Sequence, residues 1–115
     1  MTKQEFIRRC NFTVINEGNN LNTEVKTPFC CDLLSIAMSK IPAGSAWVTV
    51  MGNINTLAVA TLTEAACVIL AEGITLDAAA LSKAKSEAIT ILATDLSIFE
   101  AAYEVYQIIH ASVDL

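Results

Sequence analysis

The sequence has little charge and few of the residues that perform nucleophilic catalysis. Its 115 residues include one histidine, and 17% of them are charged, against a usual share of roughly 25%. A serine or cysteine nucleophile needs a base within hydrogen-bonding distance. His110 lies in the last turn of the predicted terminal helix, where a positive charge suits the helix dipole, and Lys83 and Lys85 lie on a predicted solvent face. We therefore predict no catalytic residues and no enzymatic activity.

Basic side chains are scarce in the second part of the chain. The net charge is −5, and residues 41–115 carry two lysines against eight acidic residues. Nucleic acids and anionic membranes are bound through basic patches. The sequence thus predicts that neither is a partner.

Long apolar runs and disulfide or zinc patterns are also missing. The most apolar stretch, residues 56–71, is broken by Glu64 and is shorter than the ~20 residues of a membrane span. Residues 1–10 contain a glutamate and two arginines in place of the apolar segment of a signal peptide. We therefore expect a cytoplasmic protein.

The four cysteines form no C-x-x-C pair, the spacing that zinc sites favour. Neighbouring Cys30 and Cys31 would point to opposite faces of a strand. We predict reduced, mostly buried thiols, no metal and no cofactor for the four residues Cys10, Cys30, Cys31 and Cys67.

Apolar residues, in contrast, make up 54% of the chain. A chain of this length forms one domain, here residues 1–115, and buries only about two-thirds of its unfolded surface. Part of the apolar surface should therefore stay exposed. We expect the protein to associate as a homodimer.

The N-terminal third predicts irregular structure. Thr2 and Glu5 have the spacing of a capping box, which indicates a short helix ending near Cys10. Residues 11–16 alternate with period two and predict a strand, and residues 24–26 predict a return strand of a hairpin. A short helix capped by Asp32 or Cys31 should follow and end before Pro42.

From residue 46 onward, strands and helices alternate. Residues 46–51, 67–70 and 89–93 predict strands, and the two later runs are continuously apolar, as in strands buried on both faces. Helices are expected from Asn53 or Asn55 to Glu64, from Thr75 or Asp77 onward, and after a Thr94–Asp95 cap to about residue 111. This order predicts an α/β fold, a three-layer domain whose mostly parallel central sheet is flanked by helices.

A ligand site is expected at the carboxyl ends of the parallel strands, where such sheets bind ligands. The loops after the three strands contribute the candidate ligand-binding residues Gly52, Asn53, Asn55, Glu72, Gly73, Thr94 and Asp95. The loops contain no lysine, no arginine and no phosphate-loop motif. A nucleotide held by its base and ribose fits these residues better than a triphosphate.

Two carboxylates in these loops leave an alternative open. Glu72 and Asp95 follow consecutive strands and could hold a divalent metal ion in an enzyme. Alternatively, Asp95 caps a helix and Glu72 is a solvated loop residue.

The last helix carries three large aromatic residues, Phe99, Tyr103 and Tyr106, at helical spacing. Such a stripe is normally core. The low charge and high apolar content of the chain favour sharing part of it with a second copy.

Four segments together resemble the DRTGG domain family. They read P-F-C-C-D-L-L-S-I-A-M at 28–38, A-W-V-T-V-M-G-N-I-N-T-L-A-V-A at 46–60, A-C-V-I-L-A-E-G at 66–73 and I-L-A-T-D-L-S-I-F-E at 91–100. The resemblance implies a three-layer α/β fold without catalytic residues, similar to the N-terminal domain of the HPr kinase/phosphorylase. It also implies a regulatory or dimerisation role, and stand-alone relatives of this kind suggest a redox or fermentative setting.

Two turns depart from the family pattern. The loop that often reads G-D-R is Gly52-Asn53-Ile54, and the later T-G-G-like turn is Ala71-Glu72-Gly73. Contacts that depend on the missing arginine are therefore not carried over. We expect a regulatory module that senses a small, nucleotide-like ligand. The alternative is an adaptor for a metabolic or hydrogenase-associated enzyme, without a small ligand.

Overall fold

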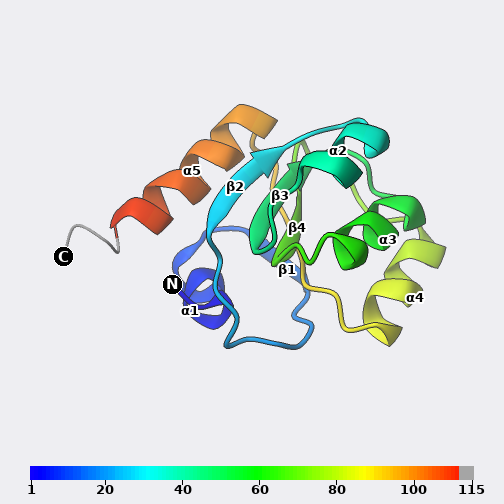
Figure 1. The fold of residues 1–115 in the computed structure, drawn as a ribbon, viewed down its shortest axis with the longest axis horizontal. Helices are drawn as coiled ribbons and strands as arrows, with labels where there is room; N and C mark the ends of the chain where they lie inside the picture. Colours follow the sequence, from blue (N-terminus) through cyan, green and yellow to red (C-terminus); the bar gives the residue numbers. More distant parts are fainter. Residues whose placement is uncertain (112–115) are drawn as a thin grey trace.

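A five-stranded sheet in the order β1-β5-β4-β3-β2 forms the centre of the computed structural model (Figure 1). Neighbouring strands from β2 to β5 are parallel, and β1 runs antiparallel to β5. The structure describes residues 1–111. The strands are β1 (Thr13–Asn16), β2 (Thr27–Cys30), β3 (Ser45–Thr49), β4 (Cys67–Leu70) and β5 (Ile91–Ala93). The helices are α1 (Lys3–Arg9), α2 (Leu34–Lys40), α3 (Ile54–Leu62), α4 (Ala78–Ser86) and α5 (Ile98–Ala111).

Helices cover both faces of the sheet (Figure 1). On β3, Val48 packs toward α1 and α5, whereas Trp47 packs toward α2, α3 and α4. On β4, Ile69 and Val68 divide between the two sides in the same way. Both faces are therefore apolar, which explains why these strands read as continuous apolar runs. The predicted three-layer α/β class is confirmed.

The predicted N-terminal hairpin does not form. β1 pairs with β5 at one edge of the sheet, and β2 pairs with β3 at the opposite edge. Residues 24–26 contribute an isolated bridge between Glu24 and Thr2, and the Val25 side chain is fully buried. Residues 24–26, which resemble a return strand, thus belong to the connection that leads from β1 at one edge of the sheet to β2 at the opposite edge.

Two helix caps also differ from the prediction. The N-cap of α2 is Leu33, and its side chain forms no capping hydrogen bond. The Asp32 carboxylate instead accepts hydrogen bonds from the Thr49 hydroxyl (2.7 Å) and the Val50 N–H (3.0 Å), joining the ends of β2 and β3. Before α5, Ser97 and Glu100 form a reciprocal capping box, so Asp95 is not the cap.

The aromatic stripe of α5 is exposed and not part of the core. Phe99 is 75% exposed, Tyr103 52% and Tyr106 51%. The buried face of the helix consists of Ala101, Val105 and Ile109. This face packs toward β2 and β3 and leaves the large aromatic rings on the outer face.

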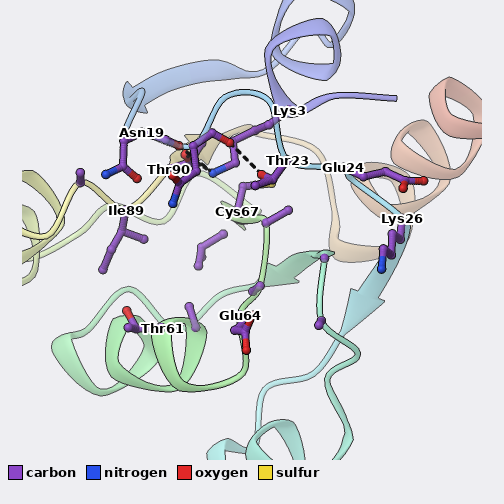
Figure 2. A pocket seen from close by; sticks show the side chains of 18 of the residues that line it. Lys3, Asn19, Thr23, Glu24, Lys26, Thr61, Glu64, Cys67, Ile89 and Thr90 are labelled. Atoms are coloured by element: carbon purple, nitrogen blue, oxygen red, sulfur yellow. Dashed lines mark hydrogen bonds between the residues drawn. The ribbon is translucent and has the colours of Figure 1, made fainter.

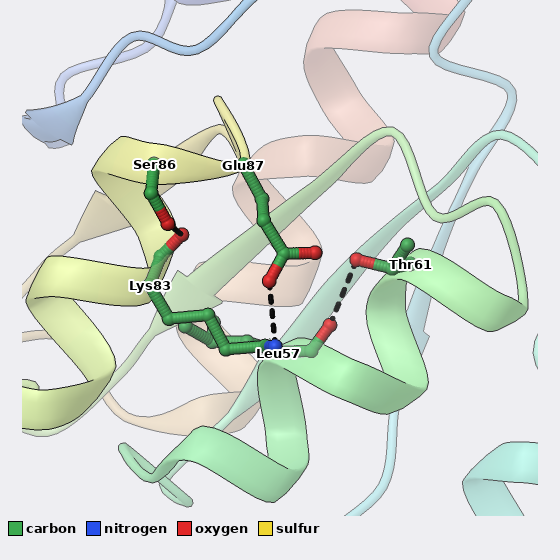
Figure 3. Close-up of polar contacts among 5 residues, drawn as sticks. All are labelled: Leu57, Thr61, Lys83, Ser86 and Glu87. Atoms are coloured by element: carbon green, nitrogen blue, oxygen red, sulfur yellow. Dashed lines mark hydrogen bonds and ion pairs between the residues drawn. The ribbon is translucent and has the colours of Figure 1, made fainter.

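The last turn of α4 carries a surface ion pair beside α3, as Figure 3 shows. Lys83 pairs with Glu87 one turn later, and on α3 the Thr61 hydroxyl donates to the Leu57 carbonyl (3.1 Å). The lysine is one of those expected on the solvent face.

Within residues 1–111, no helix combines the length and apolar character needed to cross a bilayer.

Candidate functional site

The loops that follow β3, β4 and β5 meet at the carboxyl edge of the sheet. The Gly73 N–H donates to the Thr94 carbonyl (3.0 Å), and the Asp77 N–H donates to the Gly52 carbonyl (3.3 Å). A Cβ atom on Gly52 would lie 2.5 Å from the Thr75 carbonyl oxygen, so the backbones are in close contact. The three loops that carry the candidate residues are therefore in backbone contact with one another. Their role in ligand binding stays a prediction.

The helix N-termini at this edge are occupied by side chains of the protein itself. Asn53 caps α3, as expected, by accepting hydrogen bonds from the Asn55 and Thr56 N–H groups. The Asp77 carboxylate accepts from the Ala80 N–H at the start of α4 (2.8 Å). Anions bind helix N-termini through unpaired N–H groups. A phosphate group would have to displace these caps, which is a further argument against a triphosphate.

Glu72 and Asp95 lie on adjoining loops. Glu72 has a positive φ of 60°, and its N–H donates to the Leu96 carbonyl (2.8 Å). An Asp95 carboxylate oxygen would lie 3.1 Å from a Cβ atom on Gly73. In the described part of the chain, no group of three or more histidine, cysteine or acidic residues has the arrangement of a metal site.

A cavity lies at the opposite, amino edge of the sheet (Figure 2). Its volume is about 600 Å³, and it lies between the N-terminal segment and the C-terminal end of α3, with the starts of β4 and β5 between them. Polar and charged residues make up much of its lining, among them Lys3, Asn20, Thr23, Glu24, Lys26, Thr61, Glu64 and Thr90. Sequence analysis did not identify this cavity, because the segments that line it are far apart in the chain.

Lys3 is the buried charged residue of this cavity, with only 6% of its surface exposed. Its ammonium group donates to the Asn19 carbonyl (3.0 Å) and to the Thr90 hydroxyl oxygen (3.1 Å), as Figure 2 shows. The Thr90 hydroxyl in turn donates to the Glu17 carbonyl (2.8 Å). Burial lowers the pKa of Lys3 from its ordinary value of 10.5.

One feature of the sequence could have identified Lys3. It precedes Phe6 by three residues and Cys10 by seven, and this spacing places all three on one face of a helix. Phe6 and Cys10 are both buried. A lysine on the apolar face of a helix is unusual, because burial of a charge requires compensating partners.

The cysteines divide into two buried and two more accessible residues. All four are reduced; Cys10 and Cys67 are buried, whereas Cys30 is exposed and Cys31 half-buried. The expectation of mostly buried thiols is therefore wrong for Cys30, which ends the edge strand β2. Burial raises the pKa of the Cys67 thiol from 9.0 to about 12.

We expect this shift to destabilise the protein at alkaline pH. Between pH 9 and 12 the unfolded chain loses the Cys67 proton and the folded chain keeps it, so stability falls as pH rises. The loss should approach about 1.4 kcal/mol per pH unit. Urea unfolding under reducing conditions from pH 7 to 10.5, compared with Cys67→Ala, measures this contribution.

The comparison with the variant is needed because other groups titrate in the same range. The lowered pKa of Lys3 makes stability rise with pH below 10.5, whereas the raised pKa of Cys10 acts in the same direction as Cys67. The free energy of unfolding of wild type should therefore fall relative to that of Cys67→Ala. Parallel pH profiles for the two proteins would contradict the prediction.

Sequence comparisons identify no relatives, and a structural comparison identifies the fold. No protein family matches the sequence, and no curated protein is significantly similar to it. The structure is similar to that of the CBS and DRTGG domains of the regulatory region of a Clostridium perfringens pyrophosphatase, complexed with the activator diadenosine tetraphosphate. The TM-score is 0.72 at 14% sequence identity over 92% of this chain.

The chain spans 46% of the length of that regulatory region. The fold is therefore DRTGG-like, as the resemblance of the four sequence segments implied. The similar structure is that of a regulatory region and not of a catalytic domain.

Proposed function

We propose that this chain is a non-catalytic regulatory module that pairs with a second copy of itself and responds to a small ligand. The exposed aromatic stripe of α5 carries the proposal of self-association. Phe99 and Tyr103 stack with their ring centroids 6.1 Å apart. The ring centroids of Tyr106 and His110 are 4.0 Å apart. Large aromatic residues dominate the energetics of protein interfaces. A cytoplasmic location is part of the same proposal.

The stripe suits a second copy of the chain as its occupant. Phe99, Tyr103 and Tyr106 lie on one side of the helix at helical spacing, and they include no charged side chain. In a two-fold symmetric dimer each copy contributes the same patch, so a ring-rich stripe can pack against its own equivalent. The regulatory region with the same fold supports a role in control over one in catalysis.

Replacing Tyr103 by glutamate is expected to separate the two copies. Symmetry places the new charge in the interface twice, so the dimer dissociation constant should rise by about 100-fold or more. Sedimentation velocity over a range of micromolar concentrations measures the change. Ser82→Glu adds the same charge to an exposed position of α4, on the other face of the sheet, and should leave the dimer intact. A wild-type protein that is monomeric at these concentrations would contradict the proposal.

For the ligand, we propose the carboxyl edge of the sheet and a nucleoside-like molecule held by its base and ribose. Adenosine should shift the backbone amide NMR signals of Gly52, Gly73 and Thr94 while leaving the amino edge unchanged. Adenosine triphosphate should bind no more tightly, because these loops have no basic side chain. Shifts confined to other parts of the molecule would exclude this site.

A second exposed apolar surface supports the alternative function of an adaptor. It consists of Leu33 and Ile36, three residues apart at the start of α2, which are 58% and 45% exposed. If native mass spectrometry shows a dimer without bound ligand, we expect this surface to contact a metabolic or hydrogenase-associated enzyme. A partner captured by wild type and lost with Ile36→Glu would support the adaptor, whereas a dimer with extra mass would support ligand sensing.

A further inference from the structure

The cavity at the amino edge contains a cation that lacks a counterion. Lys3 is 6% exposed, and within residues 1–111 the two ion pairs are Arg9 with Glu5 and Lys83 with Glu87. The partners of its ammonium group, the Asn19 carbonyl and the Thr90 hydroxyl, are uncharged. A buried charge without a partner of opposite sign is unfavourable. An anionic group in the cavity would supply the missing charge.

The hydrogen bonds of Lys3 leave capacity for such a group. An ammonium carries three N–H donors, and the two protein acceptors use two of them. Lys3 also lines the cavity, whose volume of about 600 Å³ is within the range of small-molecule sites. A carboxylate oxygen could therefore accept the third hydrogen bond.

The remaining charged residues determine what the rest of the ligand can be. The cavity is also lined by Glu24, Glu64 and Glu87 and by one further lysine, Lys26. Figure 2 shows Glu24 and Glu64 separated from the buried Lys3 ammonium group. Glu87 is paired with Lys83, so two lysines and two glutamates remain and the lining is neutral overall. A neutral ligand with separated charges matches it, and a polyphosphate does not.

We propose that the amino-edge cavity binds a small zwitterion whose carboxylate and ammonium group are separated by several carbon atoms, as in an ω-amino acid. Its carboxylate accepts a hydrogen bond from the Lys3 ammonium group, and its ammonium group lies on the side of the cavity where Glu24 and Glu64 both adjoin Gly44. This site is distinct from the carboxyl-edge site proposed for a nucleoside, and either can exist without the other.

A thermal-shift series with ω-amino acids of increasing chain length, alongside the individual L-amino acids, tests the proposal. At 100 times its dissociation constant, the correct amino acid should raise the melting temperature by about 10 °C. Its amide, which lacks the carboxylate, and its N-acetyl derivative, which lacks the ammonium group, should both raise it far less. If no amino acid raises the melting temperature, the proposal is wrong.

Two variants assign the effect to the cavity. Lys3→Met keeps the length of the side chain and should abolish the shift, whereas Lys40→Met, at an exposed position of α2, should preserve it. If Lys3→Met does not fold, the double variant Glu24→Gln and Glu64→Gln decides, because it should weaken binding of the amino acid by at least tenfold. A shift that persists in Lys3→Met, or unchanged affinity in the double variant, would overturn the proposal.

Discussion

Replacing Trp47 by alanine is expected to lower the free energy of unfolding by about 3–5 kcal/mol, the range for removing a buried aromatic side chain. Trp47 is fully buried on β3, and its indole N–H donates to the Cys31 carbonyl (3.0 Å). The substitution therefore leaves a cavity under α2 and α3 and an acceptor without its donor. Domains of this size have a total stability of about 5–15 kcal/mol, so much of it should be lost.

Urea unfolding followed by far-UV circular dichroism measures this change. Fluorescence is unsuitable as a shared probe, because Trp47 is the single tryptophan of the chain. Trp47→Phe retains most of the apolar contact and removes the hydrogen bond, so its cost should lie clearly below that of alanine. Equal costs for the two variants would show that the hydrogen bond, and not packing, is the main contribution.

The second large effect is expected at Gly18, in the loop that leads to the partner of Lys3. Gly18 has a φ of +74°, and a Cβ atom there would lie 2.6 Å from the Ala88 carbonyl oxygen and 2.7 Å from the Thr90 hydroxyl oxygen. Gly18→Ala combines backbone strain with a clash against a fixed backbone atom. We expect a loss of about 2–4 kcal/mol.

Gly73 provides a matched control for this prediction. Its φ of +73° is nearly the same, and a Cβ atom there would meet only a side-chain oxygen of Asp95, at 3.1 Å. Gly73→Ala should therefore cost about 1–2 kcal/mol, the strain of the left-handed conformation. Chemical unfolding of both variants gives the difference. Equal losses would mean that strain alone, without the clash, accounts for Gly18→Ala.

The fold from residue 46 onward could be predicted because its helices and strands depend on local, strongly patterned sequence. Residues 67–70 form a strand that is buried on both faces, so its sequence is apolar at every position. Asn53 and Asp77 cap the helices that follow the strands, in agreement with the preference of these residue types for that position. Each of these features depends on residues close together in sequence.

The N-terminal part could not be predicted in the same way, because its partners are distant. Thr13 pairs with Ala93, and the residues around position 13 do not encode this distant partner. The sequence analysis therefore paired residues 11–16 with the nearest short strand-like segment, residues 24–26, as a hairpin. Aspartate is a residue type that often caps helices, but the Asp32 carboxylate instead accepts a hydrogen bond from the Thr49 hydroxyl. Local preference is overridden wherever a tertiary partner satisfies the same group.

The candidate sites show the same division. The carboxyl-edge residues follow from the order of strands and helices, because parallel strands end at one edge. The amino-edge cavity depends on Lys3 and Thr90, which are 87 residues apart. Similarly, the exposure of Phe99 could not be read from its spacing, because α5 carries apolar residues at helical spacing on two sides, the buried stripe of Ala101, Val105 and Ile109 and the exposed aromatic stripe.

The position of β1 also has a consequence for how the chain folds as it is synthesised. Its partner β5 lies near the other end of the described chain, and α1 is joined to the same region through the bond between Lys3 and Thr90. While the ribosome produces β2, β3 and β4, β1 has no strand to pair with. β1 can pair only after β5 has been made, and the amino-edge cavity, which Thr90 lines, cannot be complete before then.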